Sequence, residues 1–186
     1  MTDIDNWKKV LDADRIKRSI TRIAHEILEK NGGGKRIAIV GVRTRGESLA
    51  RRIVKTIAEI EGQEPPLGVV DITLYRDDLS RISEQPLVRG TSLPFNVDNK
   101  IIILVDDVLF TGRTVRAALD AIVDFGRPVA VQLAVLCDRG HREFPIRADY
   151  IGKSFPTERR EVVDVRLAEN DGEDGVYVGQ RVPSHS

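Results

Sequence analysis

The chain has 186 residues, of which 41% are hydrophobic and 31% are charged, a composition that excludes a disordered chain and predicts one domain with a buried core. Its 29 Lys and Arg residues balance 29 Asp and Glu residues, so bulk charge does not drive binding to polyanions. The one cysteine, Cys137, excludes an intramolecular disulfide framework and a cysteine-based zinc cluster.

The N-terminal residues lack the apolar stretch of a signal peptide. The longest apolar run has about six residues, far short of the ~20 that span a membrane. We therefore expect a cytoplasmic protein in a reducing compartment, with no membrane contact.

The first half of the chain predicts helix, strand, helix and strand in turn. Apolar residues recur at helical spacing over residues 14–30, and the glycines at 32–34 end that helix. Residues 36–42 form an apolar run of strand length. A second helix starts at Gly46 and ends before Gly62, and a second strand covers residues 67–74.

The second half begins with a long segment, residues 75–99, that is rich in charge, Ser, Gly and Pro. A segment of this length without helical period is usually functional. Residues 100–105 are apolar on both faces, which is typical of a central parallel strand. A helix over 114–125, a buried strand over 130–136 and a short strand over 149–152 follow.

The C-terminal part predicts two strands, at 162–167 and 176–178, separated by an acidic turn at 169–175. We expect these two strands to pair at a sheet edge. The alternation of helices and strands along the whole chain favours an α/β layered fold with a mostly parallel sheet.

The most informative segment is the strand end that carries Asp106 and Asp107, followed by a turn with Thr111, Gly112 and Thr114. Ligands of open α/β sheets bind at the carboxyl ends of strands, and the first N–H groups of a helix bind anions. The turn therefore predicts a phosphate site. Carboxylates repel phosphate but suit hydroxyl groups or hydrated Mg²⁺, so the combination points to a sugar phosphate. The alternative is a capped helix beside two solvated aspartates.

Residues 105–114 (VDDVLFTGRT) resemble the phosphoribosyl pyrophosphate (PRPP) motif of type I phosphoribosyltransferases. Three further segments, 40–46 (VGVRTRG), 71–78 (DITLYRDD) and 137–150 (CDRGHREFPIRADY), narrow the resemblance to the bacterial PyrR family, over roughly residues 12–168. The resemblance implies a type I phosphoribosyltransferase-like α/β fold, with a mostly parallel central sheet flanked by helices, a small hood and a flexible loop.

That resemblance also implies a single domain over residues 1–186, with a hood at about 137–160 and C-terminal strands within 162–178. The implied activity is conversion of uracil and PRPP to UMP and pyrophosphate with Mg²⁺. The family also regulates pyrimidine biosynthesis genes by binding their leader mRNA in response to UMP or UTP, as a homodimer or larger assembly. A phosphoribosyltransferase that acts on uracil or another nucleobase without RNA regulation is the alternative.

The resemblance assigns Asp106, Asp107 and Arg76 to catalysis, with both aspartates holding the metal directly or through water. The phosphate of PRPP or UMP would bind Val108, Leu109, Phe110, Thr111, Gly112, Arg113 and Thr114. The pyrophosphate loop would be Arg43, Thr44, Arg45 and Gly46, with a cis peptide expected at Thr44–Arg45; the alternative is a plain basic turn. The flexible loop would be Tyr75, Arg76, Asp77 and Asp78, for which the alternative is an ordinary surface hairpin. The uracil hood would include Cys137, Asp138 and Arg139, with Cys137 packing rather than reacting.

The first helix carries a basic stripe, because Arg15, Arg18, Arg22 and His25 fall within about 80° of one another at 100° per residue. A stripe of this kind is commonly just a solvated face. The resemblance instead places Arg18, Thr21, Arg22 and His25 on an RNA-binding surface, together with a second basic cluster made of His141, Arg142, Arg147 and Lys153. Arginine can stack on splayed RNA bases and hydrogen-bond to them.

Overall fold

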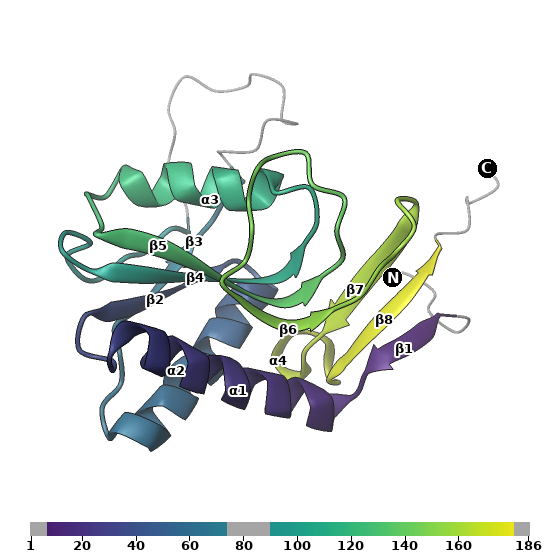
Figure 1. Ribbon diagram of the computed structural model, residues 1–186, viewed down its shortest axis with the longest axis horizontal. Helices are drawn as coiled ribbons and strands as arrows, with labels where there is room; N and C mark the ends of the chain where they lie inside the picture. The colour runs from purple at the N-terminus through teal and green to yellow at the C-terminus, as the bar shows by residue number, and fades with distance from the viewer. Residues whose placement is uncertain (1–6, 74–89, 181–186) are drawn as a thin grey trace.

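A parallel sheet of five strands forms the centre of the computed structural model, which describes residues 7–73 and 90–180 (Figure 1). In spatial order the strands are β3 (Leu67–Val70), β2 (Ile37–Val42), β4 (Ile101–Leu109), β5 (Ala130–Asp138) and β6 (Tyr150–Ser154). Each neighbouring pair is parallel. The predicted α/β fold with a mostly parallel sheet is confirmed.

Helices cover both faces of this sheet (Figure 1). Helices α1 (Ala13–Asn31) and α2 (Arg45–Glu61) lie on one face, and α3 (Arg113–Val123) lies on the other. Successive strand residues alternate between the two cores: Ile103 packs with the α1 and α2 side, whereas Ile102 and Leu104 pack with the α3 side. Because the strands are buried on both faces, their sequences are continuous apolar runs.

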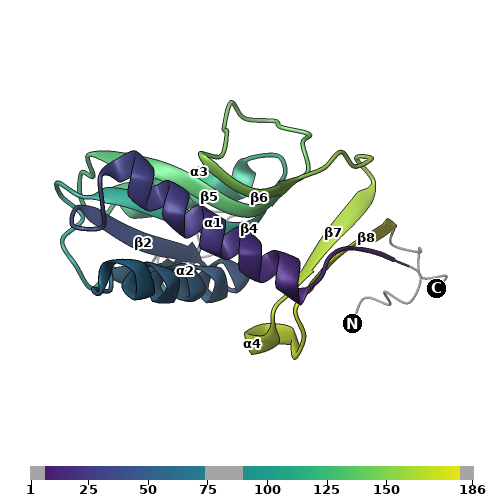
Figure 2. The ribbon, with the colours of Figure 1, turned by 60° about the horizontal axis from the view of Figure 1, so that its bottom comes forward.

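The C-terminal strands belong to a separate antiparallel sheet with the order β1-β8-β7 (Figure 2). It contains β1 (Lys8–Leu11), β8 (Gly175–Gln180) and β7 (Glu161–Arg166), and the short helix α4 (Ala168–Asp171) occupies the predicted acidic turn. The expected pairing of the two C-terminal strands at a sheet edge is confirmed, because β7 is an edge strand of this sheet and pairs with β8. Strand β1 was not predicted because its four residues pair with a strand at the other end of the chain.

Several element boundaries differ from the sequence predictions for local reasons. Strand β3 stops at Val70, since the Asp71 carboxylate accepts hydrogen bonds from the backbone N–H and hydroxyl of Thr73 and forms a turn. Strand β4 does not end before the aspartates. It continues to Leu109 because its pairing with β5 persists as far as Asp138.

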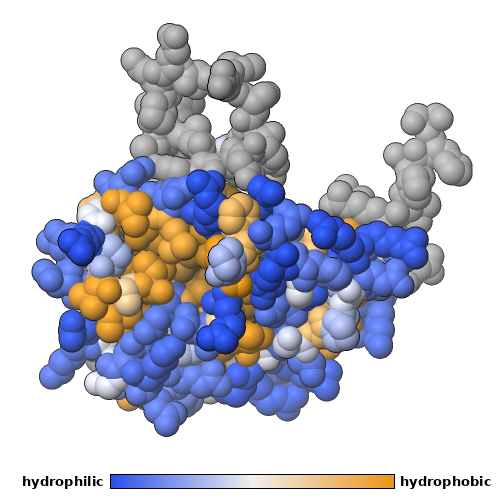
Figure 3. Space-filling model, turned by 45° about the horizontal axis from the view of Figure 1, so that its top comes forward, coloured by the Kyte–Doolittle hydropathy of each residue, from blue (hydrophilic) through white to orange (hydrophobic). Residues whose placement is uncertain are grey.

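Among the described helices, α1 and α2 share one face of the central sheet, whereas α3 alone lies on the other (Figure 1). Figure 3 shows apolar side chains gathered on this side of the molecule. Three exposed hydrophobic residues lie at the end of α3 and in the loop after it: Val123, Phe125 and Val129.

No helix among the described residues is long and apolar enough to cross a membrane.

Two glycines let β2, β4 and the start of α2 touch backbone to backbone. A Cβ on Gly41 would lie 2.6 Å from the Cα of Glu47, and one on Gly46 would lie 2.6 Å from the carbonyl oxygen of Val105. Real Cβ atoms do not approach backbone this closely. The first turn of α2 is thus held directly against the ends of two strands.

We expect Gly41→Ala to destabilise the protein by about 2 kcal/mol or more, since the backbone of α2 must move to admit the methyl group. Gly34→Ala is the control, because its Cβ would meet nothing nearer than Leu28 Cδ2 at 3.7 Å. Urea unfolding of both variants measures the difference. Equal stability of the two would contradict the close contact.

Candidate functional site

The candidate site lies at the carboxyl end of the central sheet, where β2 leads into α2 and β4 leads into α3. The first N–H groups of each helix have no partner within the helix, so two potential anion sites begin at adjacent strands. The end of β4 carries Asp106 and Asp107, and Gly46 packs against Val105 and Asp106. The fold thereby brings the predicted phosphate loop, pyrophosphate loop and carboxylates together.

The predicted phosphate loop is the turn between β4 and α3. Gly112 precedes α3 with φ of 91°, a left-handed conformation that favours glycine. The Thr111 hydroxyl accepts a hydrogen bond from the N–H of Arg113 at 3.3 Å, and Thr114 is exposed in the first turn of the helix. The backbone N–H groups and two hydroxyls of this turn can donate hydrogen bonds to a phosphate.

The two aspartates differ in environment. Asp106 is 6% exposed, and burial, followed by the charge of Asp107, raises its pKa well above the ordinary value. Its Oδ1 accepts the N–H of Asp107 at 2.9 Å, while Asp107 is half-buried and its own Oδ1 accepts the N–H of Val108 at 2.8 Å. Asp106 is thus the more buried carboxyl group, and Asp107 is the more accessible of the two.

The predicted pyrophosphate loop connects β2 to α2. Its cis peptide bond joins Arg43 to Thr44, so the expectation of a cis bond at Thr44–Arg45 is wrong. Thr44 already has αR backbone angles and precedes α2 directly, and the Thr44–Arg45 peptide is the entry into the helix. Thr44 is exposed, whereas Gly46 is buried and serves the contact with β4.

The two arginines of this loop point to different neighbours. Arg43 is exposed; its Nε donates to Glu47 Oε2 at 3.4 Å, and its charge contributes to lowering the pKa of Asp71 after the hydrogen bond from Thr73. Arg45 donates from Nε and Nη2 to both carboxylate oxygens of Asp171 in α4. The sequence analysis did not predict that contact to the C-terminal part of the chain.

The predicted uracil hood folds back over the phosphate loop. Arg139 is 5% exposed, and its guanidinium lies 4.0 Å from the centre of the Phe110 ring. It also donates to Thr157 Oγ1 at 3.1 Å and to the carbonyl of Glu158 at 3.0 Å. Burial lowers its pKa. Arg139 thus joins the phosphate loop to residues 157–158.

Cys137 and Asp138 end β5 beneath this hood. Cys137 is fully buried, and burial raises the pKa of its thiol, so the side chain packs as a neutral group. Asp138 Oδ2 accepts from Arg142 at 2.6 Å and its Oδ1 accepts the N–H of Gly140 at 3.0 Å. In the predicted phosphate loop, Leu109 is buried and Val108 is half-buried.

His141 and Arg142, which were predicted to belong to the second basic RNA-binding cluster, are half-buried and contact the phosphate loop and the hood. Arg142 donates to the carbonyls of Phe110 and Ile146, both at 2.9 Å. His141 lies edge-on to the Phe110 ring, and its Nε2 is 2.6 Å from the carbonyl of Thr157. Both side chains therefore contact Phe110 of the predicted phosphate loop.

The remaining predicted RNA-binding residues are exposed, and most lie along α1 and the edge strand β6. Arg22 joins these two elements, because its Nη2 donates to the carbonyls of Ile151 and Gly152 at 3.0 and 2.7 Å. Lys153 is the next residue of β6. The exposed set is Arg18, Thr21, Arg22 and His25 on α1, with Arg147 before β6 and Lys153 in it.

The predicted flexible loop, Tyr75, Arg76, Asp77 and Asp78, lies outside the described residues, and so does the catalytic assignment of Arg76. The described chain reaches Thr73 and resumes at Gly90. A Cβ on Gly90 would lie 2.5 Å from Nη1 of Arg43, so the pyrophosphate loop adjoins the end of this segment.

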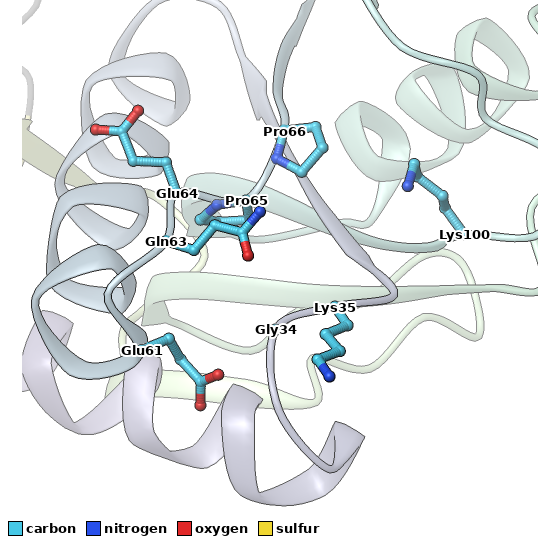
Figure 4. Close-up of a pocket in the computed structure, with 8 residues that line it drawn as sticks. All are labelled: Gly34, Lys35, Glu61, Gln63, Glu64, Pro65, Pro66 and Lys100. Carbon is cyan, nitrogen blue, oxygen red and sulfur yellow. The ribbon is translucent and has the colours of Figure 1, made fainter.

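A hollow of about 450 Å³ lies at the amino end of the sheet, away from the aspartates (Figure 4). Lysine and glutamate side chains both line it, and Figure 4 shows Lys35 below the strand and Glu64 and Lys100 pointing apart. Mixed charges without convergent donors do not favour a sugar phosphate. The strand ends therefore remain the candidate site.

Comparison with known proteins identifies the family. A sequence model of the phosphoribosyl transferase domain matches residues 6–170. The bifunctional protein PyrR of Pelotomaculum thermopropionicum is 60% identical over 170 residues, which cover 91% of this chain and 94% of that protein. The bifunctional protein PyrR of Thermus thermophilus is 57% identical over 173 residues, 93% of this chain and 96% of that protein. The chain belongs to the PyrR family.

Solved structures outside the PyrR family share the fold. A hypoxanthine phosphoribosyltransferase of Staphylococcus aureus covers 95% of this chain with a TM-score of 0.67 and 21% identity; the chain covers 93% of it. The hypoxanthine phosphoribosyltransferase of Trypanosoma cruzi in complex with the product IMP aligns with a TM-score of 0.69 and 15% identity. The alignment covers 97% of this chain and 93% of that enzyme. At these identities the likeness concerns the fold alone. The four segments that resemble the PyrR family are consistent with the much higher identity to its members.

Sequence reasoning missed the residues that act through long-range contacts. Thr157 accepts a hydrogen bond from Arg139, which is 18 residues away along the chain. Asp171 accepts hydrogen bonds from Arg45, which is 126 residues away. The one available signal was the acidic composition of residues 169–174, which follows no periodic pattern and names no partner.

We expect Asp106→Asn to raise the Tm, by an amount that grows as the pH rises above about 4. Burial and the charge of Asp107 raise the folded-state pKa of Asp106 above its ordinary value, so over a range of pH the folded wild type keeps a proton that the unfolded chain releases. The free energy of unfolding of the wild type therefore falls as the pH rises, until Asp106 ionises in the folded state. Asparagine does not titrate, so the variant does not lose this stability. Scanning calorimetry at several pH values, without Mg²⁺ or PRPP, measures the difference in Tm between the variant and the wild type. Asp120→Asn on α3 is the control. A difference in Tm that does not change with pH would contradict the prediction.

Proposed function

We propose that this chain transfers the phosphoribosyl group of PRPP to uracil, releasing pyrophosphate and forming UMP, and that it also binds RNA as a pyrimidine-responsive regulator. One observation carries the enzymatic part: two helix N-termini flank strand-end carboxylates at one edge of the sheet. PRPP has the matching shape, with a phosphate at one end, a diphosphate at the other and a diol between them.

The proposed contacts follow from this match. The 5′-phosphate binds the start of α3, where Thr111, Gly112 and Thr114 offer hydroxyl and backbone donors. The diphosphate binds the start of α2, near Thr44 and Arg45. Asp107 accepts hydrogen bonds from the ribose hydroxyls between the two anions.

Mg²⁺ fits this arrangement as an ion that arrives with the substrate. It prefers oxygen ligands, keeps several waters and commonly binds one or two carboxylates together with substrate phosphates. Across residues 7–73 and 90–180, no three His, Cys, Asp or Glu side chains are grouped as metal ligands. Asp107, with Asp106 through water, would hold the ion, which would offset the negative charge of the diphosphate when bound.

Catalysis then depends on positioning and electrostatics. The bond between ribose and diphosphate breaks as positive charge develops on the sugar, and the donors of the pyrophosphate loop stabilise the departing anion. None of the described side chains is assigned as a general base. The hood, held on the phosphate loop by Arg139 and Arg142, places the uracil against backbone groups that can pair with its carbonyls and N–H.

The regulatory part rests on the family and on the exposed basic residues of α1 and β6. Relatives in the PyrR family are named bifunctional, which agrees with a second role beside transfer. The exposed side chains of Arg18, His25 and Lys153 can reach an RNA without entering the substrate site. A homodimer or larger assembly, as the resemblance implies, stays a prediction.

Asp107→Asn tests the enzymatic part. Loss of a charged contact to the diol or metal costs about 1.5–3 kcal/mol, so kcat/KM with PRPP falls about 10- to 150-fold while the Tm changes little. Asp120→Asn removes an equivalent charge from exposed α3 and keeps full activity. Near-normal kcat/KM in Asp107→Asn would remove this residue from the site.

Arg18→Ala combined with His25→Ala tests the regulatory part. Arg22 is left intact because it also anchors β6. The double variant binds leader RNA of a pyrimidine operon more weakly, and the slope of log K against log salt becomes shallower by roughly 0.7 for each lost phosphate contact. Uracil transfer stays at the wild-type rate.

Mobility-shift titrations at several salt concentrations, with and without UMP, give the affinity and the slope. Arg116→Ala, on the opposite face of the sheet, is the matched control and leaves both unchanged. Active wild-type enzyme that binds no leader RNA would favour a phosphoribosyltransferase without RNA regulation.

A further inference from the structure

The first turns of α2 are tied to the acidic segment around α4 by three side chains at helical spacing. Arg45, Ser48 and Arg52 lie on one face of α2, at i, i+3 and i+7. Their partners on the other side are Asp171 for Arg45, Asn170 for Ser48, and both Glu169 and Asp174 for Arg52. Four residues of one short segment thus hold the helix that begins at the pyrophosphate loop.

Arg45 is the member of this set that belongs to the pyrophosphate loop. Its Nε lies 3.1 Å from Asp171 Oδ2 and its Nη2 lies 2.7 Å from Asp171 Oδ1, a side-on bidentate pair. This pairing uses two of the five N–H groups of the guanidinium. The Nη1 end stays available to a second acceptor.

The pair of Arg45 and Asp171 carries opposite charges that shift the pKa of both groups. The hydrogen bond to Asp171 raises the pKa of Arg45 most, and the charge of Asp107 also contributes. Asp171 is mostly buried, and burial alone would raise its pKa, but Arg45 and the N–H of Leu167 hold that pKa below the ordinary value. The carboxylate is therefore a charged anchor for the guanidinium of Arg45, whose neighbour Gly46 packs against Val105 and Asp106 at the end of β4.

We propose that Asp171 is a positioning residue that orients the Arg45 guanidinium, so that its remaining N–H groups meet the diphosphate of PRPP. The inference rests on the function proposed above. A free arginine at the start of a helix samples many rotamers, and ordering it costs free energy on binding. Asp171 provides that order before the substrate arrives.

Attachment of α4 does not require this pair. Arg52 already makes bidentate contacts with both Glu169 and Asp174, and Ser48 donates to Asn170 at 2.8 Å. The Arg45–Asp171 pair is thus free to serve orientation of the loop rather than docking of the segment.

Asp171→Asn tests the proposal. Asparagine keeps an acceptor for the N–H of Leu167 but loses the charge and one of the two acceptors for Arg45. The KM for PRPP rises about five- to tenfold, with kcat at saturating PRPP changed less than about twofold, because the lost interaction is made in ground and transition states alike. Glu169→Gln weakens a bidentate pair in the same segment without touching Arg45, and it leaves KM unchanged.

A double-mutant cycle with Arg45→Ala separates orientation from general loosening of the structure. In the Arg45→Ala background, Asp171→Asn changes the KM for PRPP less than about twofold. Wild-type KM in Asp171→Asn, or an equal increase in both backgrounds, would overturn the proposal. Calorimetric titration with inorganic pyrophosphate repeats the comparison without turnover, so an inactive wild type would contradict the proposed function and still leave the role of Asp171 decided.

Discussion

The site depends on the backbone contact between the start of α2 and the end of β4. Gly46 lies against the Val105 carbonyl, and Gly41 in β2 lies under Glu47, at distances that leave no room for a Cβ. This contact fixes the N-terminus of α2 beside the strand that ends in Asp106 and Asp107. The N-terminus of α3 follows from the same strand only a few residues later. Two positive helix ends and two carboxyl groups therefore share one edge of the sheet.

Segments distant in sequence complete this arrangement through hydrogen bonds to its backbone and to the Arg45 side chain. The Thr111 carbonyl accepts N–H groups from Glu143 and Phe144, and the Phe110 carbonyl accepts from Arg142. On the other side, α4 holds Arg45. The hood thus contacts the predicted phosphate loop and the acidic segment contacts the predicted pyrophosphate loop, so each loop has a partner outside its own strand–helix unit.

The sequence predicted the central sheet because its strands are buried on both faces and its helices have regular apolar spacing. It also predicted which loops meet, since carboxyl ends of neighbouring parallel strands share an edge. It could not predict β1, because that strand pairs with β8, about 165 residues away along the chain. It could not predict the Arg45–Asp171 pair either, since side-chain contacts between distant segments leave no periodic pattern. The cis bond was misplaced by one residue because the exact start of α2 decides which peptide enters the helix.

The central claim is that two separate anion sites bind the two ends of one ligand. Calorimetric titrations of inorganic pyrophosphate and ribose 5-phosphate, singly and together in the presence of Mg²⁺, test it most directly. The account predicts that both bind the protein at the same time and that PRPP displaces both. Mutual exclusion of pyrophosphate and ribose 5-phosphate, as for one shared anion site, would contradict it.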